Sequence, residues 1–522
     1  MTTKYYLTQL MLRATQRRGV QPVIFCESRE ISYKEMSRRV ARLAAALQAL
    51  GVKPGDRVGL LALNSERFVE AMFAVWWAGA VLNPINIRWA PSEIAYSLDD
   101  CDTRVLFVDQ AFMGMLPMLR QQSQSLQTCI QLDAAESNER ALGAEALIKE
   151  NGPVPDARRG DEDLAGVFYT GGTTGQPKGV MLSHAALFTN ALISQADLPV
   201  DESNVLLMCA PLFHLAGLSF LMRALMSSCQ MVILPFFSPL GVCEAVAQHK
   251  VSMFFAVPVM LQMLVDHPEV KSYNFNSVSI IGYGGSPIAE ALLDRAFEVF
   301  PRASFVQGYG MTELSAGVST LPAAYHTPDG RVAGLLRSAG RALPGVSLRV
   351  VNAFDEDVPI GESGELLVCS PAVMQGYWNR PKETSAALRD GWMHTGDVAR
   401  INEHGFVFIV DRLKDMIISG GENVYCTEVE NVIARHPAVA AVAVIGVPSE
   451  QWGESVHAVV MPKSGATVSP DEIIELCRTH LGGYKCPRSV EIRTELPLSG
   501  AGKILKHVLR APYWQSQIRE VA

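Results

Sequence analysis

Apolar residues along this chain alternate between a helical period and continuous runs. From residue 36 to residue 50 they form one stripe at helical spacing, and Gly51 follows it, which predicts a helix that ends there. Ser32 stands at the N-cap position, and Glu35 three residues later predicts a capping box. Residues 58–63 are apolar without interruption, as expected of a strand that is buried on both faces.

The same alternation continues through two long stretches. A second helical pattern covers residues 65–80, and an apolar strand lies near residues 104–108. Between residues 205 and 319 the pattern predicts strands at 231–234, 253–257 and 278–283 and a helix at 289–300. Helices that alternate with near-continuous apolar strands indicate α/β architecture, with mainly parallel sheets that are doubly covered. The charged segment 156–162 is expected to be a surface connection between subdomains.

The pattern changes after residue 340. Short strands are predicted at 347–351, 364–369 and 406–410, divided by Gly, Pro and Asp turns, which indicates a small β-rich subdomain. The rest of the chain predicts a small α/β domain, with helices at 428–435 and 471–481 and strands at 439–447 and 457–462. We therefore expect a large N-terminal domain, residues 1–411, joined by a hinge at residues 411–415 to a C-terminal domain, residues 412–522.

Composition narrows the classes of function. The chain has 522 residues, of which 48% are hydrophobic and 19% charged, and this fits a globular enzyme with a large core. Its net charge of -8 argues against a nucleic-acid partner. The ten cysteines include no CxxC pair, and neither a secretory leader nor an uninterrupted apolar run of about 18 residues is seen. We expect a cytoplasmic protein without integral membrane association.

A loop of glycine and hydroxyl residues follows the apolar run at residues 164–169. Residues 169–180 read YTGGTTGQPKGV, so that Lys178 is the loop's one cation. Glycines allow backbone N–H groups to turn outward, and threonine hydroxyls add donors, which predicts an anion-binding loop. The loop is not a Walker A motif, because Lys178 follows proline and precedes glycine.

Residues 307–313, QGYGMTE, follow a predicted strand and carry groups suited to a nucleotide. Tyr309 stands between glycines, and its ring is free to lie against a planar ring such as adenine. Thr312 offers a hydroxyl to a phosphate, and Glu313 offers hard oxygen ligands that suit Mg²⁺. The sequence therefore predicts a second nucleotide contact at this strand end.

A carboxylate at another turn is suited to ribose. Asp397 closes the segment 390–397, DGWMHTGD, and a carboxylate accepts hydrogen bonds well from vicinal hydroxyls. Arg412 is placed to add a second contact. Residues 281–287, IGYGGSP, are also rich in glycine but lack the spacing of a dinucleotide fingerprint.

In their order and spacing, these segments resemble the adenylate-forming superfamily, which includes acyl-CoA synthetases, luciferases and peptide-synthetase adenylation domains. The resemblance covers the chain nearly end to end. It implies that Tyr309 stacks on adenine, Thr312 contacts the α-phosphate, Glu313 helps to hold magnesium, and Asp397 and Arg412 bind ribose. The nucleotide-binding residues that it implies are Thr170, Gly171, Gly172, Thr173, Thr174, Lys178, Gly284, Gly285, Ser286, Gly308, Tyr309, Gly310, Met311, Thr312, Asp397 and Arg412.

The resemblance also implies the catalytic residues. The segment 495–506 matches the superfamily's C-terminal signature, in which the lysine, here Lys503, bridges the substrate carboxylate and a phosphate oxygen. Lys503 is preferred to Lys178 for this role. His214 matches a histidine that flanks the carboxylate pocket, so it is expected to be a pocket wall or gate that orients the acid, and not a general base. Thr174 and Glu313 complete the expected catalytic set.

A second group of residues matches positions that serve coenzyme A in the superfamily. The segment 418–426 resembles the pantetheine-tunnel loop, although Cys426 stands where relatives commonly have proline. Lys414 matches the residue about which the C-terminal domain rotates. The expected members of this group are Gly420, Gly421, Glu422, Trp452 and Lys485.

The activity implied is that of an AMP-forming acyl-CoA synthetase, with ATP, Mg²⁺, CoA and a carboxylic acid as reactants. The small and apolar residues expected around the acid favour a hydrophobic aliphatic acid, with an aryl acid as the alternative. Two other readings stay open: a ligase that loads a carrier protein, and a regulatory nucleotide-binding protein without turnover. The expected oligomeric state is a monomer or a homodimer. The acid pocket is expected to be lined by His214, Leu218, Val257, Tyr283, Gly308, Met311 and Ser315.

Overall fold

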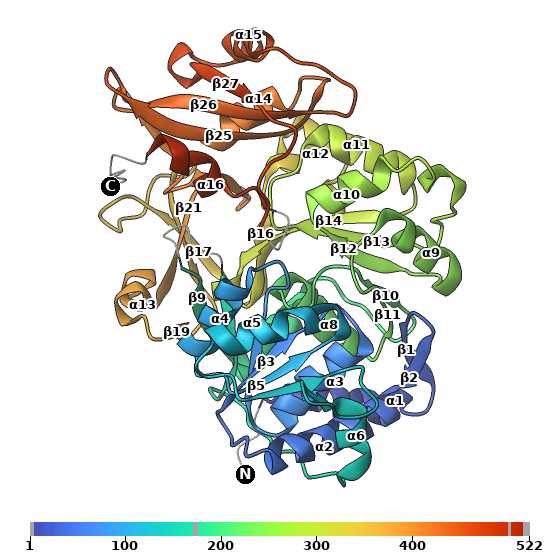
Figure 1. Ribbon diagram of the computed structural model, residues 1–522. Coiled ribbons are helices and arrows are strands. Elements are labelled where there is room, and N and C mark those ends of the chain that lie inside the picture. The colour runs from blue at the N-terminus through green and yellow to red at the C-terminus, as the bar shows by residue number, and fades with distance from the viewer. Residues whose placement is uncertain (1–4, 171–175, 500–502, 515–522) are drawn as a thin grey trace.

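A computed structural model describes residues 5–170, 176–499 and 503–514 (Figure 1). The predicted architecture is confirmed: two large sheets with helices between and around them form the N-terminal part. A small antiparallel sheet and a separate C-terminal α/β domain follow. Among the described residues, no helix is long and apolar enough to cross a membrane.

The first large sheet is parallel at its centre and antiparallel at one edge. Parallel pairing joins β8, β4, β3, β5, β6 and β7, whereas β9 runs antiparallel to both β8 and β19. Within the described residues, its strands in spatial order are β19 (Gly376–Tyr377), β9 (Lys178–Ser183), β8 (Leu164–Thr170), β4 (Val81–Pro84), β3 (Arg57–Leu61), β5 (Val105–Val108), β6 (Thr128–Gln131) and β7 (Leu142–Gly143).

The second large sheet has the same plan. Parallel pairing runs from β1 to β14, and the outer strands are antiparallel. Within the described residues, its strands in spatial order are β16 (Arg341–Ala342), β15 (Ala316–Leu321), β14 (Ser304–Met311), β13 (Ile280–Gly284), β12 (Met253–Ala256), β10 (Val205–Met208), β11 (Gln230–Ile233), β1 (Pro22–Cys26) and β2 (Arg29–Ser32).

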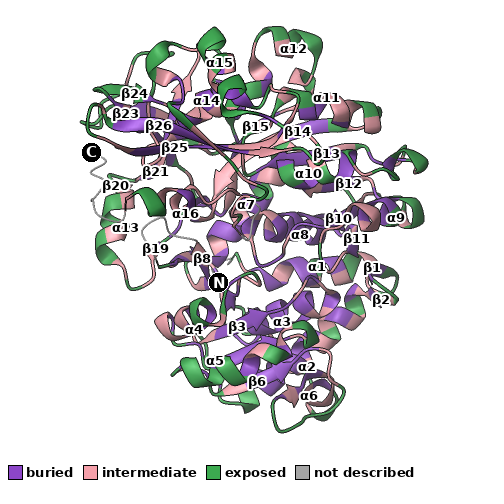
Figure 2. Cartoon of the chain, turned by 45° about the horizontal axis from the view of Figure 1, so that its top comes forward, coloured by how far each residue is buried: buried purple, intermediate pink, exposed green. Residues whose placement is uncertain are grey.

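Helices between the two sheets form the main core. Helix α3 (Glu66–Trp77) and helix α8 (Leu215–Ser227) are buried on almost every side, and Figure 2 shows α8 as a largely buried helix. Their apolar side chains pack in one cluster with residues of both sheets. The other helices of this part are α1 (Thr8–Arg18), α2 (Tyr33–Ala49), α4 (Pro91–Asp100), α5 (Leu116–Gln122), α6 (Ala144–Glu150), α7 (His184–Asp197), α9 (Pro239–His249), α10 (Pro258–Val265), α11 (Glu290–Val299) and α12 (Pro328–Val332).

The smaller units follow in chain order. An antiparallel sheet carries β17, β18, β21, β20 and β22, with helix α13 (Pro381–Ala387) beside it. Its strands are β17 (Ser347–Val351), β18 (Gly364–Cys369), β20 (Leu388–Arg389), β21 (Trp392–Ile401) and β22 (Val407–Arg412). The C-terminal domain contains β23 (Ile417–Ser419), β24 (Glu422–Val424), α14 (Cys426–Ile433), β25 (Val439–Ser449), β26 (Gly453–Pro462), α15 (Pro470–His480), β27 (Ser489–Ile492) and α16 (Lys506–Arg510).

Two local expectations need correction. Ser32 does cap α2, because its Oγ accepts the Glu35 N–H at 3.2 Å, but the Glu35 carboxylate pairs with Arg38 instead of completing a capping box. The charged segment 156–162 does not connect two subdomains: it leads from α6 to β8, which are packed on or within the same sheet. In the first case, Arg38 lies three residues after Glu35 on α2 and takes up the carboxylate that a capping box would use.

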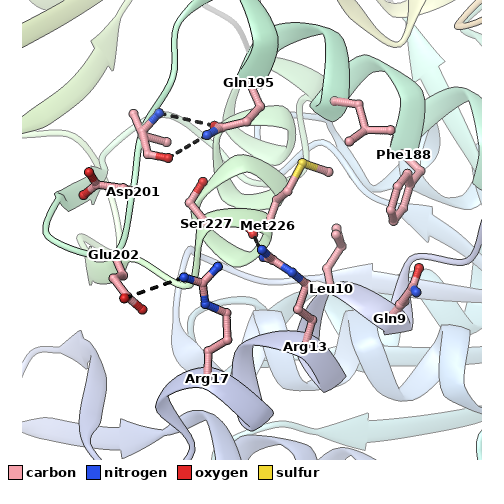
Figure 3. A pocket seen from close by; sticks show the side chains of 12 residues that line it. Gln9, Leu10, Arg13, Arg17, Phe188, Gln195, Asp201, Glu202, Met226 and Ser227 are labelled. Carbon is pink, nitrogen blue, oxygen red and sulfur yellow. Dashed lines mark hydrogen bonds and ion pairs between the residues drawn. The ribbon is translucent and has the colours of Figure 1, made fainter.

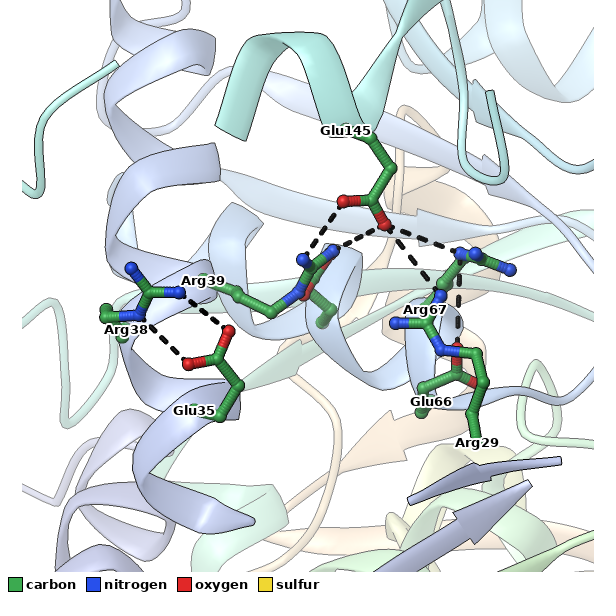
Figure 4. A network of polar contacts seen from close by, with 8 residues as sticks. Arg29, Glu35, Arg38, Arg39, Glu66, Arg67 and Glu145 are labelled. Carbon is green, nitrogen blue, oxygen red and sulfur yellow. Dashed lines mark hydrogen bonds and ion pairs between the residues drawn. The ribbon is translucent and has the colours of Figure 1, made fainter. Parts of the chain in front are cut away.

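A partly buried network of ion pairs ties α2, α3 and α6 together (Figure 4). Arg39 contacts Glu70 and also lies 2.8 Å from Glu145, and Arg29 lies 3.0 Å from Glu66. Burial raises the pKa of Glu70, and the Arg39 cation opposes that shift. Because Glu70 is almost fully buried, its charge depends on this partner.

Candidate active site

The carboxyl ends of β13 and β14 lie side by side and carry two of the predicted glycine segments. Gly284 pairs with Gly308 in parallel register. A Cβ atom on Gly284 would lie 2.1 Å from the Gly308 carbonyl oxygen, so no larger residue fits there without moving the strand. Gly308 itself has open space at its Cβ position. The two strand ends therefore present bare backbone at one edge of the sheet.

Tyr309, Asp397 and Arg412 meet from three strands. The Tyr309 hydroxyl donates to Asp397 Oδ2 at 2.6 Å, and Arg412 Nε lies 2.7 Å from Asp397 Oδ1. Pairing of β21 with β22 sets Asp397 directly beside Arg412. Burial, followed by the Asp397 charge, raises the pKa of Tyr309 well above its usual range, and Asp397 raises the pKa of Arg412. The predicted adenine and ribose residues thus form one contiguous group.

Glu313 lies next to this group, immediately after β14. It is buried, and its Oε1 accepts a hydrogen bond from the Tyr377 hydroxyl at 2.9 Å. The Lys178 Nζ lies 5.3 Å from the centre of the Tyr377 ring, within the range of a cation–π contact. Tyr377 therefore links the phosphate loop's lysine to the expected magnesium ligand, and sequence reasoning missed it.

The phosphate loop is held at both of its ends. Thr170 ends β8 and pairs with Lys178, the first residue of β9. The residue before Thr170, Tyr169, donates its hydroxyl to Asp100 Oδ2 at 2.7 Å. Four of the predicted loop residues lie outside the described residues: Gly171, Gly172, Thr173 and Thr174.

Lys503, near the end of the chain, reaches this group from the C-terminal domain. Its Cε lies 4.0 Å from the Cβ position of Gly285, at the end of β13. Burial and then the Arg412 cation lower the pKa of Lys503, Asp397 and Glu313 act in the opposite direction, and the resulting pKa is about 8. The influence of a charge on a pKa weakens with distance. The effects of Arg412, Asp397 and Glu313 therefore agree with an ammonium group close to the predicted nucleotide residues.

His214 lies on the same side of the site. It caps α8, with Nδ1 accepting the Ala216 N–H at 3.2 Å. Burial, followed by the Lys503 cation, lowers the pKa of His214 to about 4. A neutral, half-buried imidazole near Lys503 fits the expected pocket wall, and its Nδ1 is occupied as an acceptor.

Tyr283 and Ser315 are placed differently from the expected acid pocket. The Tyr283 side chain is fully buried in the core beneath α10 and α11, and its hydroxyl lies 2.9 Å from His326 Nε2. The Ser315 hydroxyl is buried and donates to the Ala372 carbonyl at 2.7 Å. Tyr283 precedes Gly284 in β13, and successive side chains of a strand point to opposite faces, so its ring points to the face opposite that of Gly284.

The predicted coenzyme A residues form a separate group in the C-terminal domain. Gly420 lies against Trp452, since a Cβ atom on Gly420 would stand 2.8 Å from Trp452 Cε3. Lys485 Nζ is 2.8 Å from both carboxylate oxygens of Glu428. Gly421, in the turn between β23 and β24, and Glu422, the first residue of β24, are exposed. Figure 2 shows β23 and β24 at the outer edge of the molecule, apart from β13 and β14, which carry the glycine segments of the nucleotide group.

The segment between the domains is fixed by buried polar contacts. Asp411 accepts the N–H of Cys426, and the Cys426 thiol donates to the Asp415 carbonyl at 3.0 Å. Arg510 pairs with Asp415 at 2.7 Å. Burial, followed by the charge of Arg412, lowers the pKa of Lys414. Cys426 therefore serves as a buried packing and hydrogen-bonding residue at the start of α14.

A pocket of about 430 Å³ lies elsewhere, between α1, α7 and α8 (Figure 3). Arg13 and Arg17 enter it from α1, with Arg13 donating to the Met226 carbonyl and Arg17 lying 3.6 Å from Glu202. It shares no lining residue with the candidate active site.

Comparison with known protein families identifies the family to which this chain belongs. Residues 12–378 match the family described as AMP-binding enzyme, and residues 428–503 match the AMP-binding enzyme C-terminal domain. The chain belongs to the AMP-binding enzyme family. The predicted membership in the adenylate-forming superfamily, as an AMP-forming acyl-CoA ligase, is confirmed.

Individual relatives of this AMP-binding enzyme carry different acids in their names. A feruloyl-CoA synthase of Amycolatopsis is 41% identical, over 92% of this chain and 93% of its own. The medium/long-chain-fatty-acid–CoA ligase FadD8 of Mycobacterium tuberculosis is 33% identical, over 98% of this chain and 91% of its own. The crystal structure of the anthranilate CoA ligase AuaEII in complex with anthranoyl-AMP superposes with a TM-score of 0.90 at 25% identity, covering 98% of each chain.

Proposed function

We propose that this AMP-binding enzyme activates a carboxylic acid with Lys503 and then transfers the acyl group to coenzyme A. The observation that carries this proposal is the approach of Lys503 to Gly285, in the field of Asp397, Glu313 and Arg412. A cation from the last part of the chain thereby completes a group that is otherwise built by the large domain.

In the first step, a carboxylate oxygen of the acid attacks the α-phosphorus of ATP. The bond from that phosphorus to the bridging oxygen breaks, pyrophosphate leaves, and an acyl-adenylate is formed. Two anions must approach each other, so Lys503 and Lys178 are positioned to offset their repulsion. Asp397 and Tyr309 hold the ribose and adenine in this proposal, and His214 borders the acid. No enzyme nucleophile is required.

The residues present fit magnesium that is held together with substrate phosphates. Glu313 offers a buried carboxylate, yet the described residues contain no group of three or more His, Cys, Asp or Glu side chains able to hold a metal alone. Mg²⁺ typically uses one or two carboxylates with phosphate oxygens and water. Bound there, magnesium would neutralise phosphate charge. Glu313 would hold it, and Tyr377 would keep that carboxylate oriented.

In the second step, the thiol sulfur of coenzyme A attacks the acyl carbon, its proton is released, and AMP leaves as the thioester forms. The predicted tunnel residues belong to the C-terminal domain, and its strands β23 and β24 stand apart from β13 and β14 (Figure 2). These residues are Gly420 to Glu422, Trp452 and Lys485. We propose that residues 412–522 turn about Lys414 relative to residues 1–411, which removes Lys503 and brings the tunnel residues in. The separation of the two groups supports two orientations of one domain.

Half-reactions measured separately test the role of Lys503. Lys503→Ala should abolish ATP–pyrophosphate exchange, yet still convert a supplied acyl-adenylate and coenzyme A into thioester. Lys463→Ala, an exposed lysine of the same domain, is the control and should retain both. Equal loss of both half-reactions in the Lys503 variant would refute this division of labour.

For the acid, a phenylpropenoic acid of the ferulic type is our first candidate. The feruloyl-CoA synthase is 41% identical to this chain, whereas the fatty-acid–CoA ligases FadD8 and FadD13 are 33% and 35% identical. Gly308, with open space at its Cβ position, and the exposed Gly285 offer bare backbone that suits a flat conjugated acid. An aliphatic acid, favoured by the sequence alone, is the second candidate, supported by those fatty-acid relatives.

An acid panel separates these candidates. We expect the largest kcat/KM, measured by AMP release, for ferulate, and lower values for its side-chain-saturated analogue and for fatty acids of graded length. A maximum at a fatty acid would favour the aliphatic candidate. Since a fatty acid–[acyl-carrier-protein] ligase is 34% identical to this chain, the panel should be run with coenzyme A and with a phosphopantetheine carrier protein. We expect turnover with coenzyme A.

A further inference from the structure

Arg88 joins the large domain directly to the segment that carries Lys503. Its Nη1 donates to the Ser499 carbonyl oxygen at 2.9 Å, across 411 positions of sequence. Arg88 stands just after β4, at the carboxyl end of a central parallel strand, where sites of open α/β sheets form. None of the motifs that indicate nucleotide or coenzyme A binding includes this arginine.

The turn that carries Arg88 is held firmly. The Arg88 N–H donates to Asn86 Oδ1 at 3.0 Å, and the Trp89 N–H donates to the Asn86 carbonyl at 3.1 Å. The Trp89 side chain is buried and meets the Tyr169 ring edge-on at 6.5 Å. Tyr169 directly precedes Thr170, the start of the phosphate loop. The turn therefore has a fixed place relative to that loop.

On the other side of the contact, Ser499 is bound to Lys503. The Ser499 N–H donates to the Lys503 carbonyl at 2.7 Å, and the Lys503 N–H donates to Ser499 Oγ at 3.0 Å. A β-bridge between Leu498 and Ile504 flanks this pair. Because both backbone groups of Lys503 are bonded to Ser499, restraint of the Ser499 carbonyl restrains the backbone from which the Lys503 side chain extends.

We propose that Arg88 is a positioning residue for the first half-reaction: it docks Ser499, and through it the Lys503 backbone, against the large domain and so sets the place of the Lys503 ammonium. This inference rests on the proposed function. The bond joins the two domains, so a turn of the C-terminal domain breaks it. Arg88 therefore supports acyl-adenylate formation and has no part in thioester formation.

The test compares Arg88→Gln with a matched control, Arg120→Gln. Arg120 is also exposed and also donates to a backbone carbonyl, that of Arg140 at 2.7 Å, but both residues lie within the large domain. ATP–pyrophosphate exchange and conversion of a supplied acyl-adenylate with coenzyme A are measured on each full-length protein. Thermal unfolding of each variant accompanies the assays.

We expect Arg88→Gln to lower kcat of exchange by about 3- to 10-fold, the loss of roughly one net hydrogen bond, with an unchanged KM for ATP and unchanged thioester formation. Arg88→Lys keeps a charged donor and should recover part of the loss. Arg120→Gln should leave both half-reactions intact. An exchange rate equal to wild type in Arg88→Gln, or equal loss of both half-reactions, would overturn the inference.

The same assays separate this inference from the proposed function. If Lys503→Ala retains exchange, the role proposed for Lys503 fails, whatever Arg88→Gln does. If Lys503→Ala loses exchange and Arg88→Gln retains it, only the docking role of Arg88 fails.

Discussion

The Tyr309 hydroxyl donates a hydrogen bond to Asp397 Oδ2 at 2.6 Å, so the expected adenine platform contacts the expected ribose ligand directly. Arg412 occupies the other oxygen of the same carboxylate. Asp397 is buried, so its charge is offset by these two partners. Ribose hydroxyls that bind Asp397 must therefore share its oxygens with Tyr309 and Arg412.

Asp397→Asn should weaken ATP binding, because the amide keeps the shape of the side chain but loses the charge that Arg412 faces. The loss of a charged hydrogen-bonding group predicts a rise of about 10- to 100-fold in the KM for ATP. Initial rates of ATP–pyrophosphate exchange measure it. Asp390→Asn, an exposed residue of the same turn segment, is the control and should bind ATP normally. An unchanged KM in Asp397→Asn would remove Asp397 from the nucleotide site.

The pH profile of exchange should report Lys503. Its pKa is lowered to about 8, so the side chain is cationic below that pH and loses its charge as pH rises. The value of kcat/KM, which reflects the free enzyme, should therefore fall above about pH 8. Lys503→Arg keeps a cation at high pH, so whatever exchange it retains should lack this alkaline decline. The same decline in both proteins would assign it to another group.

Gly284→Ala should destabilise the fold, because the added methyl group meets the Gly308 carbonyl oxygen at 2.1 Å. Forcing extra volume into packed backbone predicts a loss of about 1–3 kcal/mol in the free energy of unfolding. Gly308→Ala is the natural control, since its Cβ position is open. Denaturant unfolding of both variants gives the comparison, and equal stability would contradict the close approach of the two strands.

Gly420→Leu should slow thioester formation and leave acyl-adenylate formation intact. The new side chain meets Trp452 and narrows the expected path of the pantetheine arm. Gly420 has a φ of +61°, so the variant also carries backbone strain. Gly465→Leu, at a φ of +76° with open space around it, controls for that strain in the same domain. Loss of thioester formation in both variants would point to strain instead of a blocked path.

Arg39→Ala should cost far more stability than Arg38→Ala, its neighbour on α2. Arg39 is the partner of the buried Glu70, and removal of one member of a buried pair costs about 3–5 kcal/mol. Arg38 pairs with Glu35 at the surface, where such pairs contribute about 0–1 kcal/mol. Thermal or denaturant unfolding measures both, and similar losses would mean that the burial of Glu70 is relieved in another way.

The sequence predicted what depends on local pattern. Apolar runs located most parallel strands, because a strand buried on both faces must be apolar throughout. The segments that end β8, β13 and β14 were found because each combines glycine and hydroxyl residues at a strand end, and their roles were assigned from their resemblance, in order and spacing, to the adenylate-forming superfamily. The N-cap at Ser32 was also found from local sequence, because a serine stands directly before the helical stripe of apolar residues.

What the sequence left out depends on contacts between distant segments. Tyr377 reaches Glu313 only because β19 pairs with β9, and Arg88 reaches Ser499 only because the two domains dock. No local pattern signals either contact. Tyr283 was expected in the acid pocket, but strand alternation places its ring in the core, where its hydroxyl forms a hydrogen bond with His326 Nε2.

The lysine three positions after Lys503 makes its contact within the C-terminal domain. Lys506 is half-buried and its Nζ lies 2.8 Å from Glu430 Oε1 within the C-terminal domain, while Lys503 reaches Gly285 of the large domain. Only Ile504 and Leu505 lie between these two lysines. If residues 412–522 turn as proposed, the Lys503 amine would be carried with the C-terminal domain, because the Lys506–Glu430 ion pair holds the chain three residues away.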